Sequence, residues 1–241
     1  MPINIKKEFE QAITFLEGLP TNSKGARLFD YDTSLTLVGS GSGKKIPQGG
    51  FKYICHFEDK KWPANVALAV PKLSDGSAKI KAEAEAMASV VKQQPKYNLI
   101  PFQKIEGMTF GCKTDPANTS VAGFLMQWIP DCIDGKPFVA ARAKKIAGPK
   151  GKLRNNFIDV INTLPDKQVS VVREFFTTIK PVWGTKSIDD FQVLIDKTTG
   201  EVYTIDVDKL VGGGDEEELD LVLEHIRTPA STIKVLRLRG G

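Results

Sequence analysis

The chain has 241 residues, 41% of them hydrophobic, which is enough to bury a core in one domain or in two small lobes. Its 33 basic and 29 acidic side chains leave a formal charge of only +4, so no nucleic-acid partner is expected. No apolar run approaches the roughly 20 residues that cross a bilayer, so no membrane span is expected, and the start MPINIKKEFEQ lacks the apolar segment of a secretory signal. Three widely spaced cysteines and two distant histidines predict neither a disulfide framework nor a zinc cluster.

The first half of the chain is predicted to be rich in strands. The spacing of Phe9, Ile13 and Leu16 predicts a helix over 5–19. KYICHFE and NVALAVPK have the Val, Ile and Tyr content of strands, and AKIKAEAEAMASVV has strong helix propensity. NLIPFQKIEGMTFGC and SVAGFLMQWI then predict two further strands.

The sequence changes from strand-rich to helix-rich patterns near residue 130. DCIDGKPF is predicted to be a turn-rich connection, and helices are predicted over 155–163 and 167–180. VLIDKTTGEVYTID predicts a two-stranded hairpin whose turn is residues 197–200. The fold class is therefore α+β, with a strand-rich part over 1–130 and a helix-rich part over 131–241.

A glycine hairpin and a lysine on a strand indicate phosphate binding in the first part. Gly49 and Gly50 form a tip with little side chain, so backbone amides could approach phosphate oxygens. GSGSGK at 39–44 does not match the strict phosphate loop, because its outer glycines enclose three residues and a second lysine follows. Lys72 ends the apolar strand VALAVPK, where a buried stem requires an anion for the ammonium group.

Lys72 is expected to pair with a carboxylate on the helix that follows it. Glu83 and Glu85 are both available. Glu83 shares its helical face with the apolar Met87 and Val90, so it is predicted to point inward and is the preferred partner.

Acidic residues in the second part provide candidates for a base and a metal site. Pairing within the predicted hairpin brings Gln192 close to Asp206, so both could bind one Mg²⁺ ion, while Asp190 could orient an acceptor hydroxyl. Asp189 and Asp208 are alternatives at neighbouring positions.

These segments together resemble a protein kinase. IPQGGFKYIC resembles the kinase glycine loop, VALAVPK the strand that carries the ATP lysine, and IDDFQVLIDKTTGEVYTIDVD the catalytic hairpin. FLMQWIP resembles the kinase hinge, which implies that Met126 is the gatekeeper and that the backbone of Gln127 and Trp128 contacts adenine. The resemblance spans roughly residues 46–210 and implies a reduced, bilobal kinase-like fold with an antiparallel-sheet N-lobe and a truncated helical C-lobe.

The chain departs from the kinase pattern at several positions. Pro47 and Lys52 stand where the first and third loop glycines are usual, and Val207-Asp208 replaces the Phe-Gly that follows the metal aspartate. There is no His-Arg-Asp motif; the base is assigned to Asp190 because small secreted bacterial kinases use a shortened Asp-x-Gln form.

The nearest pattern is that of minimal effector kinases injected by bacterial pathogens. This resemblance implies a Ser/Thr protein kinase that uses ATP and Mg²⁺, is made in the bacterial cytoplasm and acts in the host cytosol. The implied partner is a host protein, and the resemblance points to a heat-shock chaperone, since one such family phosphorylates a chaperone. The alternatives are a kinase-like pseudoenzyme that only binds nucleotide and, less well supported by motif order, an ATP-grasp-like ligase.

The carboxyl-terminal LRLRGG is identical to the last six residues of ubiquitin. It predicts a narrow, extended basic tail in which Arg237, Arg239, Gly240 and Gly241 could contact the ubiquitin system. A binding or conjugation module is therefore a second functional hypothesis, alongside an edge strand with a frayed tip and residues added by construction.

Overall fold

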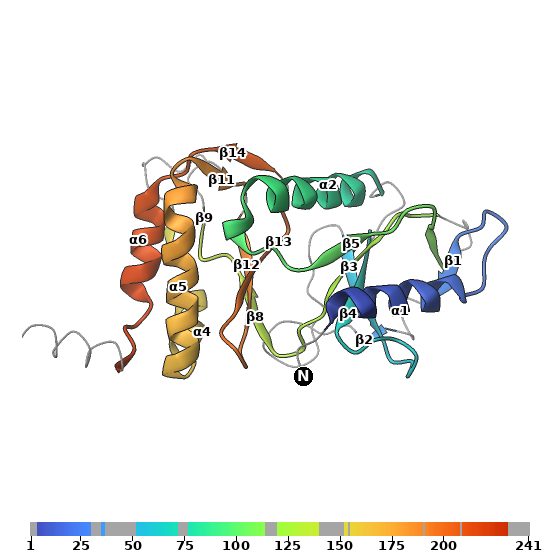
Figure 1. Cartoon of the computed structure of the whole chain (residues 1–241), viewed down its shortest axis with the longest axis horizontal. Coiled ribbons are helices and arrows are strands. Elements are labelled where there is room, and N and C mark those ends of the chain that lie inside the picture. The colour runs from blue at the N-terminus through green and yellow to red at the C-terminus, as the bar shows by residue number, and fades with distance from the viewer. Residues whose placement is uncertain are drawn as a thin grey trace, which may run out of the picture. The chain divides into compact units, whose positions relative to one another are not determined.

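The computed structural model describes residues 4–29, 35–36, 52–71, 77–113, 120–139, 152–153, 155–189, 191–207 and 209–230. It is a mixed α+β structure with antiparallel sheets, and its described part contains five α-helices (Figure 1). The chain divides into two compact units, the first made of 1–85 and 100–130 and the second of 86–99 and 131–241. One boundary between the units, after residue 130, therefore coincides with the change from strand-rich to helix-rich sequence. Another boundary, after residue 85, falls inside a helix.

The first unit contains a five-stranded antiparallel sheet. Its strands are ordered β2 (Leu35–Thr36), β3 (Lys52–Phe57), β4 (Val66–Pro71), β7 (Phe124–Gln127) and β5 (Phe102–Lys104). In the central strands Ile54 lies opposite Ala69, which lies opposite Phe124. A short parallel pair, β1 (Arg27–Phe29) and β6 (Phe110–Cys112), completes the strands of this unit.

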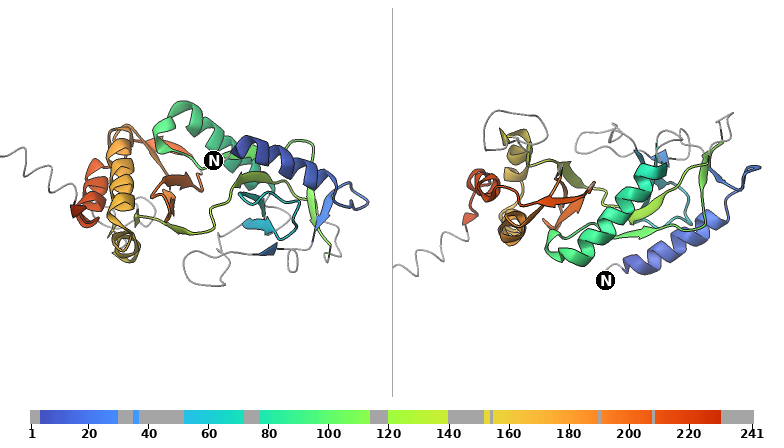
Figure 2. Two further views of the ribbon diagram at one scale, coloured as in Figure 1. Left: turned by 60° about the horizontal axis from the view of Figure 1, so that its bottom comes forward. Right: turned by 90° about the horizontal axis from the view of Figure 1, so that it is seen from above.

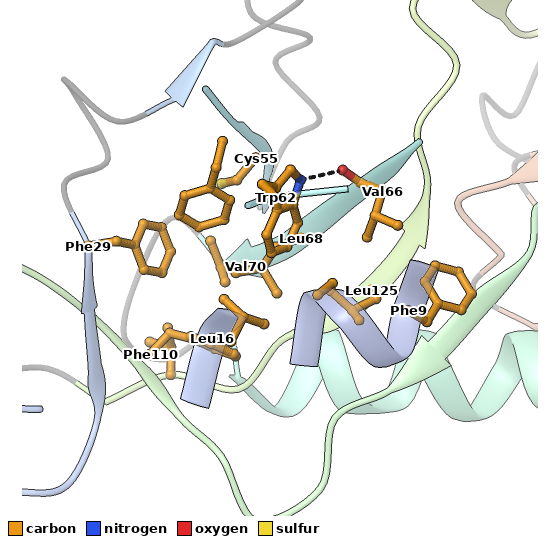
Figure 3. Packing of buried hydrophobic residues seen from close by; sticks show 13 residues of the cluster. Phe9, Leu16, Phe29, Cys55, Trp62, Val66, Leu68, Val70, Phe110 and Leu125 are labelled. Atoms are coloured by element: carbon orange, nitrogen blue, oxygen red, sulfur yellow. Dashed lines mark hydrogen bonds between the residues drawn. The ribbon is translucent and has the colours of Figure 1, made fainter. Parts of the chain in front are cut away.

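Helix α1 (Ile5–Glu17) packs against β4 and closes the core of the first unit. Phe9, Ala12 and Leu16 recur at helical spacing and are all buried. They join alternate residues of the sheet in one apolar cluster, as Figure 3 shows for Leu68, Val70 and Leu125. The Trp62 indole N–H donates to the Val66 carbonyl at 2.8 Å, so the buried indole has a polar partner. The members of this cluster lie on a single face of the sheet, because strand side chains alternate between faces.

The second unit contains a three-stranded antiparallel sheet and two short strand pairs. The sheet is ordered β13 (Val202–Ile205), β12 (Gln192–Asp196) and β8 (Cys132–Gly135). The pairs are β11 (Lys186–Ile188) with β14 (Leu210–Gly212), and β9 (Phe138–Val139) with β10 (Lys152–Leu153).

Helices α4 (Asn155–Asn162) and α5 (Asp166–Trp183) pack against this three-stranded sheet. Helix α6 (Glu216–His225) packs on α5, and Figure 2 shows these two helices side by side. The buried face of α5 carries Val172, Phe176 and Ile179, while Val193 and Ile195 are the fully buried residues of β12. Lys180 joins α5 to Asp220 of α6 through hydrogen bonds of 2.7 and 2.8 Å.

Helix α2 (Ser77–Gln93) contains residues of both units and is followed by the 3-10 turn η2 (Pro95–Tyr97). Residues 77–85 belong to the first unit, and 86–93 with η2 belong to the second. Tyr97 is fully buried, and its hydroxyl donates to the Lys186 carbonyl. Burial raises the pKa of this hydroxyl, so it remains a donor at any physiological pH.

Most predicted elements are confirmed. The four predicted helices correspond to α1, α2, α4 and α5, and the predicted hairpin is β12–β13. Two expectations were wrong: DCIDGKPF includes strand β8, and NLIPFQKIEGMTFGC forms two strands in different sheets, β5 and β6. None of the helices in the described ranges is both long and apolar enough to cross a membrane.

Candidate functional site

A buried ion pair joins β3 to α2 in the first unit. The Lys52 ammonium group donates to the Glu83 carboxylate, and the two residues are only 6% and 4% exposed. The predicted inward orientation of Glu83 is confirmed by this burial, and Glu85 is exposed. The sequence assigned Lys52 to the phosphate lid and did not predict its contact with Glu83. Lys72, the predicted partner, lies outside the described residues.

The register of the sheet explains why Lys52 points toward α2. Lys52 lies opposite Pro71, and so shares a face with Ala69 and Phe124 rather than with the α1 core. Its ammonium nitrogen is 5.8 Å from the centroid of the Phe124 ring, within the range of a cation–π contact. A single sequence could not reveal this contact, because it depends on the pairing of β3 with β4.

The same sheet face carries small side chains beside a methionine. Ala67 lies opposite Met126, and Ala69 lies opposite Phe124. Ala67 and Ala69 occupy successive positions on this face of β4, and both are fully buried. Met126 is thus on the same sheet face as the Lys52–Glu83 pair.

The two backbone N–H groups that follow Met126 are already hydrogen-bonded within the protein. Gln127 donates its N–H to the Pro101 carbonyl, and Trp128 donates its N–H to the Asn65 carbonyl, both at 2.8 Å. The Trp128 ring packs on His56, with centroids 5.3 Å apart. Any contact of adenine with the peptide between Gln127 and Trp128 must therefore use the carbonyl rather than these N–H groups.

In the second unit, the register of the hairpin places Gln192 near the backbone of Asp206, the other predicted metal ligand. Gln192 lies opposite Ile205, the residue before Asp206. Asp206 has a left-handed backbone with φ of 53°, a conformation that aspartate tolerates better than most residues. Val207, which follows it, is fully buried. Asp190 and Asp208 lie outside the described residues, whereas Asp189 is described and faces Lys209 at 3.9 Å.

An amide oxygen and a carboxylate at this hairpin end are ligand types that suit Mg²⁺, which takes few protein ligands and keeps several waters. Among the described residues, no group of three or more His, Cys, Asp or Glu side chains could hold a metal ion. Within the described residues, Gln192 and Asp206 are therefore not part of a metal cage formed by such side chains.

The sheet face that carries Leu194 combines apolar and acidic side chains. Leu194 is half-buried and lies opposite Asp134 on one side and Tyr203 on the other. Burial first, and then the charge of Asp134, raises the pKa of the Cys132 thiol to about 12. Burial alone raises the pKa of Cys55. Both thiols are therefore protonated at neutral pH.

Several predicted positions are not described by the structure. They are Gly49 and Gly50 of the glycine tip, Lys72, Asp190, and the tail residues Arg237, Arg239, Gly240 and Gly241. Comparison of the chain with models of known protein families and with curated proteins gave no match.

Proposed function

We propose that this chain is an ATP- and Mg²⁺-dependent Ser/Thr protein kinase with a reduced, bilobal kinase-like fold. The observation that carries the proposal is the buried Lys52–Glu83 pair. A buried ion pair is seldom a gain in stability, because removing both charges from water costs about as much as their attraction returns. A lysine held in place by a glutamate can instead neutralise phosphate oxygens. This is the usual role of a strand lysine that is paired with a helix glutamate in phosphoryl transfer.

The other described residues support distinct parts of the reaction. Ala67, Ala69 and Met126 suit an aromatic base, and the Gln127 carbonyl suits its amino group. Gln192 and Asp206 would hold Mg²⁺, which neutralises charge on the phosphates when bound. Asp190, two residues before Gln192, would accept the proton of the acceptor hydroxyl. The substrate proposed is a host protein, with a chaperone as the first to test.

Lys52 and Lys72 are both candidates for the lysine that contacts phosphate, and substitution distinguishes them. Magnesium-ATP affinity would be measured by calorimetry for Lys52→Met and Lys72→Met, with the exposed Lys104→Met on β5 as the matched control. The lysine that contacts phosphate should lose about tenfold or more in affinity, in line with loss of a charged hydrogen bond. If both variants bind like the control, neither lysine contacts phosphate.

Phosphoryl transfer from ATP to a protein is tested with radiolabelled ATP and a host lysate. Asp206→Asn keeps a residue that accepts the left-handed backbone but removes the charge, so it should fold and lose incorporation by at least a hundredfold. The exposed Asp159→Asn on α4 is the control. Equal incorporation by wild type and Asp206→Asn would reject the kinase.

A pseudoenzyme is the second candidate, because Val207 is buried where kinases carry a mobile aromatic residue. It predicts binding of magnesium-ATP without transfer to any protein. A binding module that uses the LRLRGG tail would be tested separately, by asking whether ubiquitin-activating enzyme forms a thioester with the chain.

A further inference from the structure

The Gln127 carbonyl is excluded from the sheet ladder by its neighbour. In a hydrogen-bonded antiparallel pair, each residue donates its N–H to the carbonyl of the other. Gln127 donates to Pro101 at 2.8 Å, but Pro101 has no N–H and cannot donate in return. The ladder between β5 and β7 therefore leaves this carbonyl without its regular donor.

The direction of that carbonyl is set by the next N–H along the chain. The Gln127 carbonyl and the Trp128 N–H belong to one planar trans peptide, so they point in opposite directions. The Trp128 N–H is bound to the Asn65 carbonyl at 2.8 Å. Whatever orients Asn65 therefore orients the Gln127 carbonyl.

Asn65 is oriented by Glu8 of α1. The Glu8 carboxylate accepts the Asn65 backbone N–H at 3.1 Å with one oxygen and the Asn65 side-chain N–H at 2.9 Å with the other. In a regular pair the Asn65 backbone N–H would bond to Trp128 instead. Two charge-assisted bonds to one carboxylate therefore determine how Asn65 presents its carbonyl.

Glu8 itself is firmly placed. It lies in the first turn of α1, where a carboxylate is favoured by the helix dipole, and is half-buried. Asn4 caps the helix by accepting the Lys7 N–H at 3.2 Å, and Phe9, next to Glu8, is in the apolar core. The carboxylate is therefore anchored by the core of the first unit.

We infer that Glu8 is a positioning residue for base recognition: through Asn65 and the Trp128 N–H it aims the Gln127 carbonyl at the 6-amino group of adenine. This inference rests on the proposed function. It implies selection for purine nucleotides with an amino donor at position 6, and it gives α1, which the sequence did not link to the site, a part in that selection.

The test compares Glu8→Gln with Glu10→Gln, an exposed glutamate on the same helix. Glutamine at position 8 puts an amide donor against one of the two Asn65 donors. Affinity is measured by calorimetry for magnesium-ATP, for magnesium purine riboside triphosphate, which lacks the 6-amino group, and for magnesium tripolyphosphate. Glu8→Gln should weaken ATP about tenfold, the effect of one misplaced hydrogen bond, and leave the other two ligands within about twofold.

An equal loss for all three ligands would overturn the inference, because a general structural defect would act on all of them. Unchanged ATP affinity would also overturn it. Asn65→Ala, which removes only the side-chain donor, should show an intermediate loss restricted to ATP.

Amide hydrogen exchange provides a readout that needs no nucleotide. Glu8→Gln should speed exchange of the Trp128 N–H by about tenfold and leave the Gln127 N–H, bound to Pro101, unchanged. If wild type binds none of the ligands, the proposed function fails, and the exchange rates still decide whether Glu8 orients this peptide. Equal exchange of Trp128 in wild type and variant would overturn that structural step.

Discussion

Lys52 is the residue whose environment is hardest to explain by stability alone. Lysine is almost never fully buried unless it is paired, and here its stem lies on the sheet face while its head group contacts Glu83 and the Phe124 ring. Each charge is solvated in part by the other. Removing one charge should therefore be worse than removing both.

Lys52→Met should lower the free energy of unfolding by about 3 kcal/mol, because it leaves a carboxylate buried without this cation. Adding Glu83→Gln to it should recover more than half of that loss. Urea denaturation of the two single variants and the double variant measures the coupling. Additive losses would mean that the two side chains do not interact in solution.

The β12–β13 hairpin is the element that the sequence predicted best, and its turn can be tested directly. Gly200 has φ of 79°, and a β-carbon there would lie 2.6 Å from the Gln168 backbone. Gly25 has a similar φ of 77° but open space around it. The two positions therefore separate backbone strain from steric overlap.

Gly25→Ala should lose about 1 kcal/mol of stability through left-handed strain alone. Gly200→Ala should lose clearly more, about 3 kcal/mol, because α5 must also move away from the turn. Chemical denaturation of both variants provides the comparison. Equal losses would show that the hairpin turn can relax away from α5.

Helix α5 begins beside a polar clamp that joins it to the segment after α6. Arg227 donates to the Asp166 carboxylate, to Asn162 and to the Leu164 carbonyl, and the Ala230 N–H donates to Asp166 at 3.1 Å. The hydrogen bond from Arg227, followed by that from Ala230, lowers the pKa of Asp166 below its usual 3.8. A carboxylate with a lowered pKa stabilises the fold above the unfolded-state value and loses this contribution as the pH falls through the folded-state value.

Asp166→Asn should therefore unfold more easily than wild type at neutral pH and approach it as the pH falls through the lowered folded-state pKa of Asp166, below which both side chains are neutral. Thermal unfolding at several pH values measures the difference, with Asp159→Asn as the exposed control. A difference that stays constant down to pH 2 would show that the clamp does not depend on ionised Asp166.

Elements with strong local patterns were predictable, and those defined by pairing were not. The Lys-Thr-Thr-Gly turn and the alanine-rich α2 carry their own signals. Strand β8 has four residues, Cys132–Gly135, and is a strand only because it pairs with β12. The same limit applies at the site: Glu83 could be predicted to face inward from helical periodicity, but its contact with Lys52 and the path from Glu8 to Gln127 follow from register and tertiary contacts.

At the scale of the whole molecule, α2 is the element on which both units depend. Ile80 and Ala84 are buried residues of its first-unit part, and Met87 and Val90 are buried residues of its second-unit part. A helix interrupted at its middle would lose the cooperativity of one continuous hydrogen-bonded ladder. Unfolding of either unit should therefore remove part of the support of the other.

We expect a single cooperative urea transition, although the chain forms two units. Trp62 and Trp128 report on the first unit and Trp183 on the second. Fluorescence of Trp183→Phe and of the double variant Trp62→Phe with Trp128→Phe should each be compared with the loss of helical circular dichroism in the same protein. Within each variant the two midpoints should coincide, because α2 couples the units. Midpoints separated by more than about 0.5 M urea would show that the units unfold independently, since typical slopes of 1–3 kcal/mol per molar make that a difference of about 1 kcal/mol.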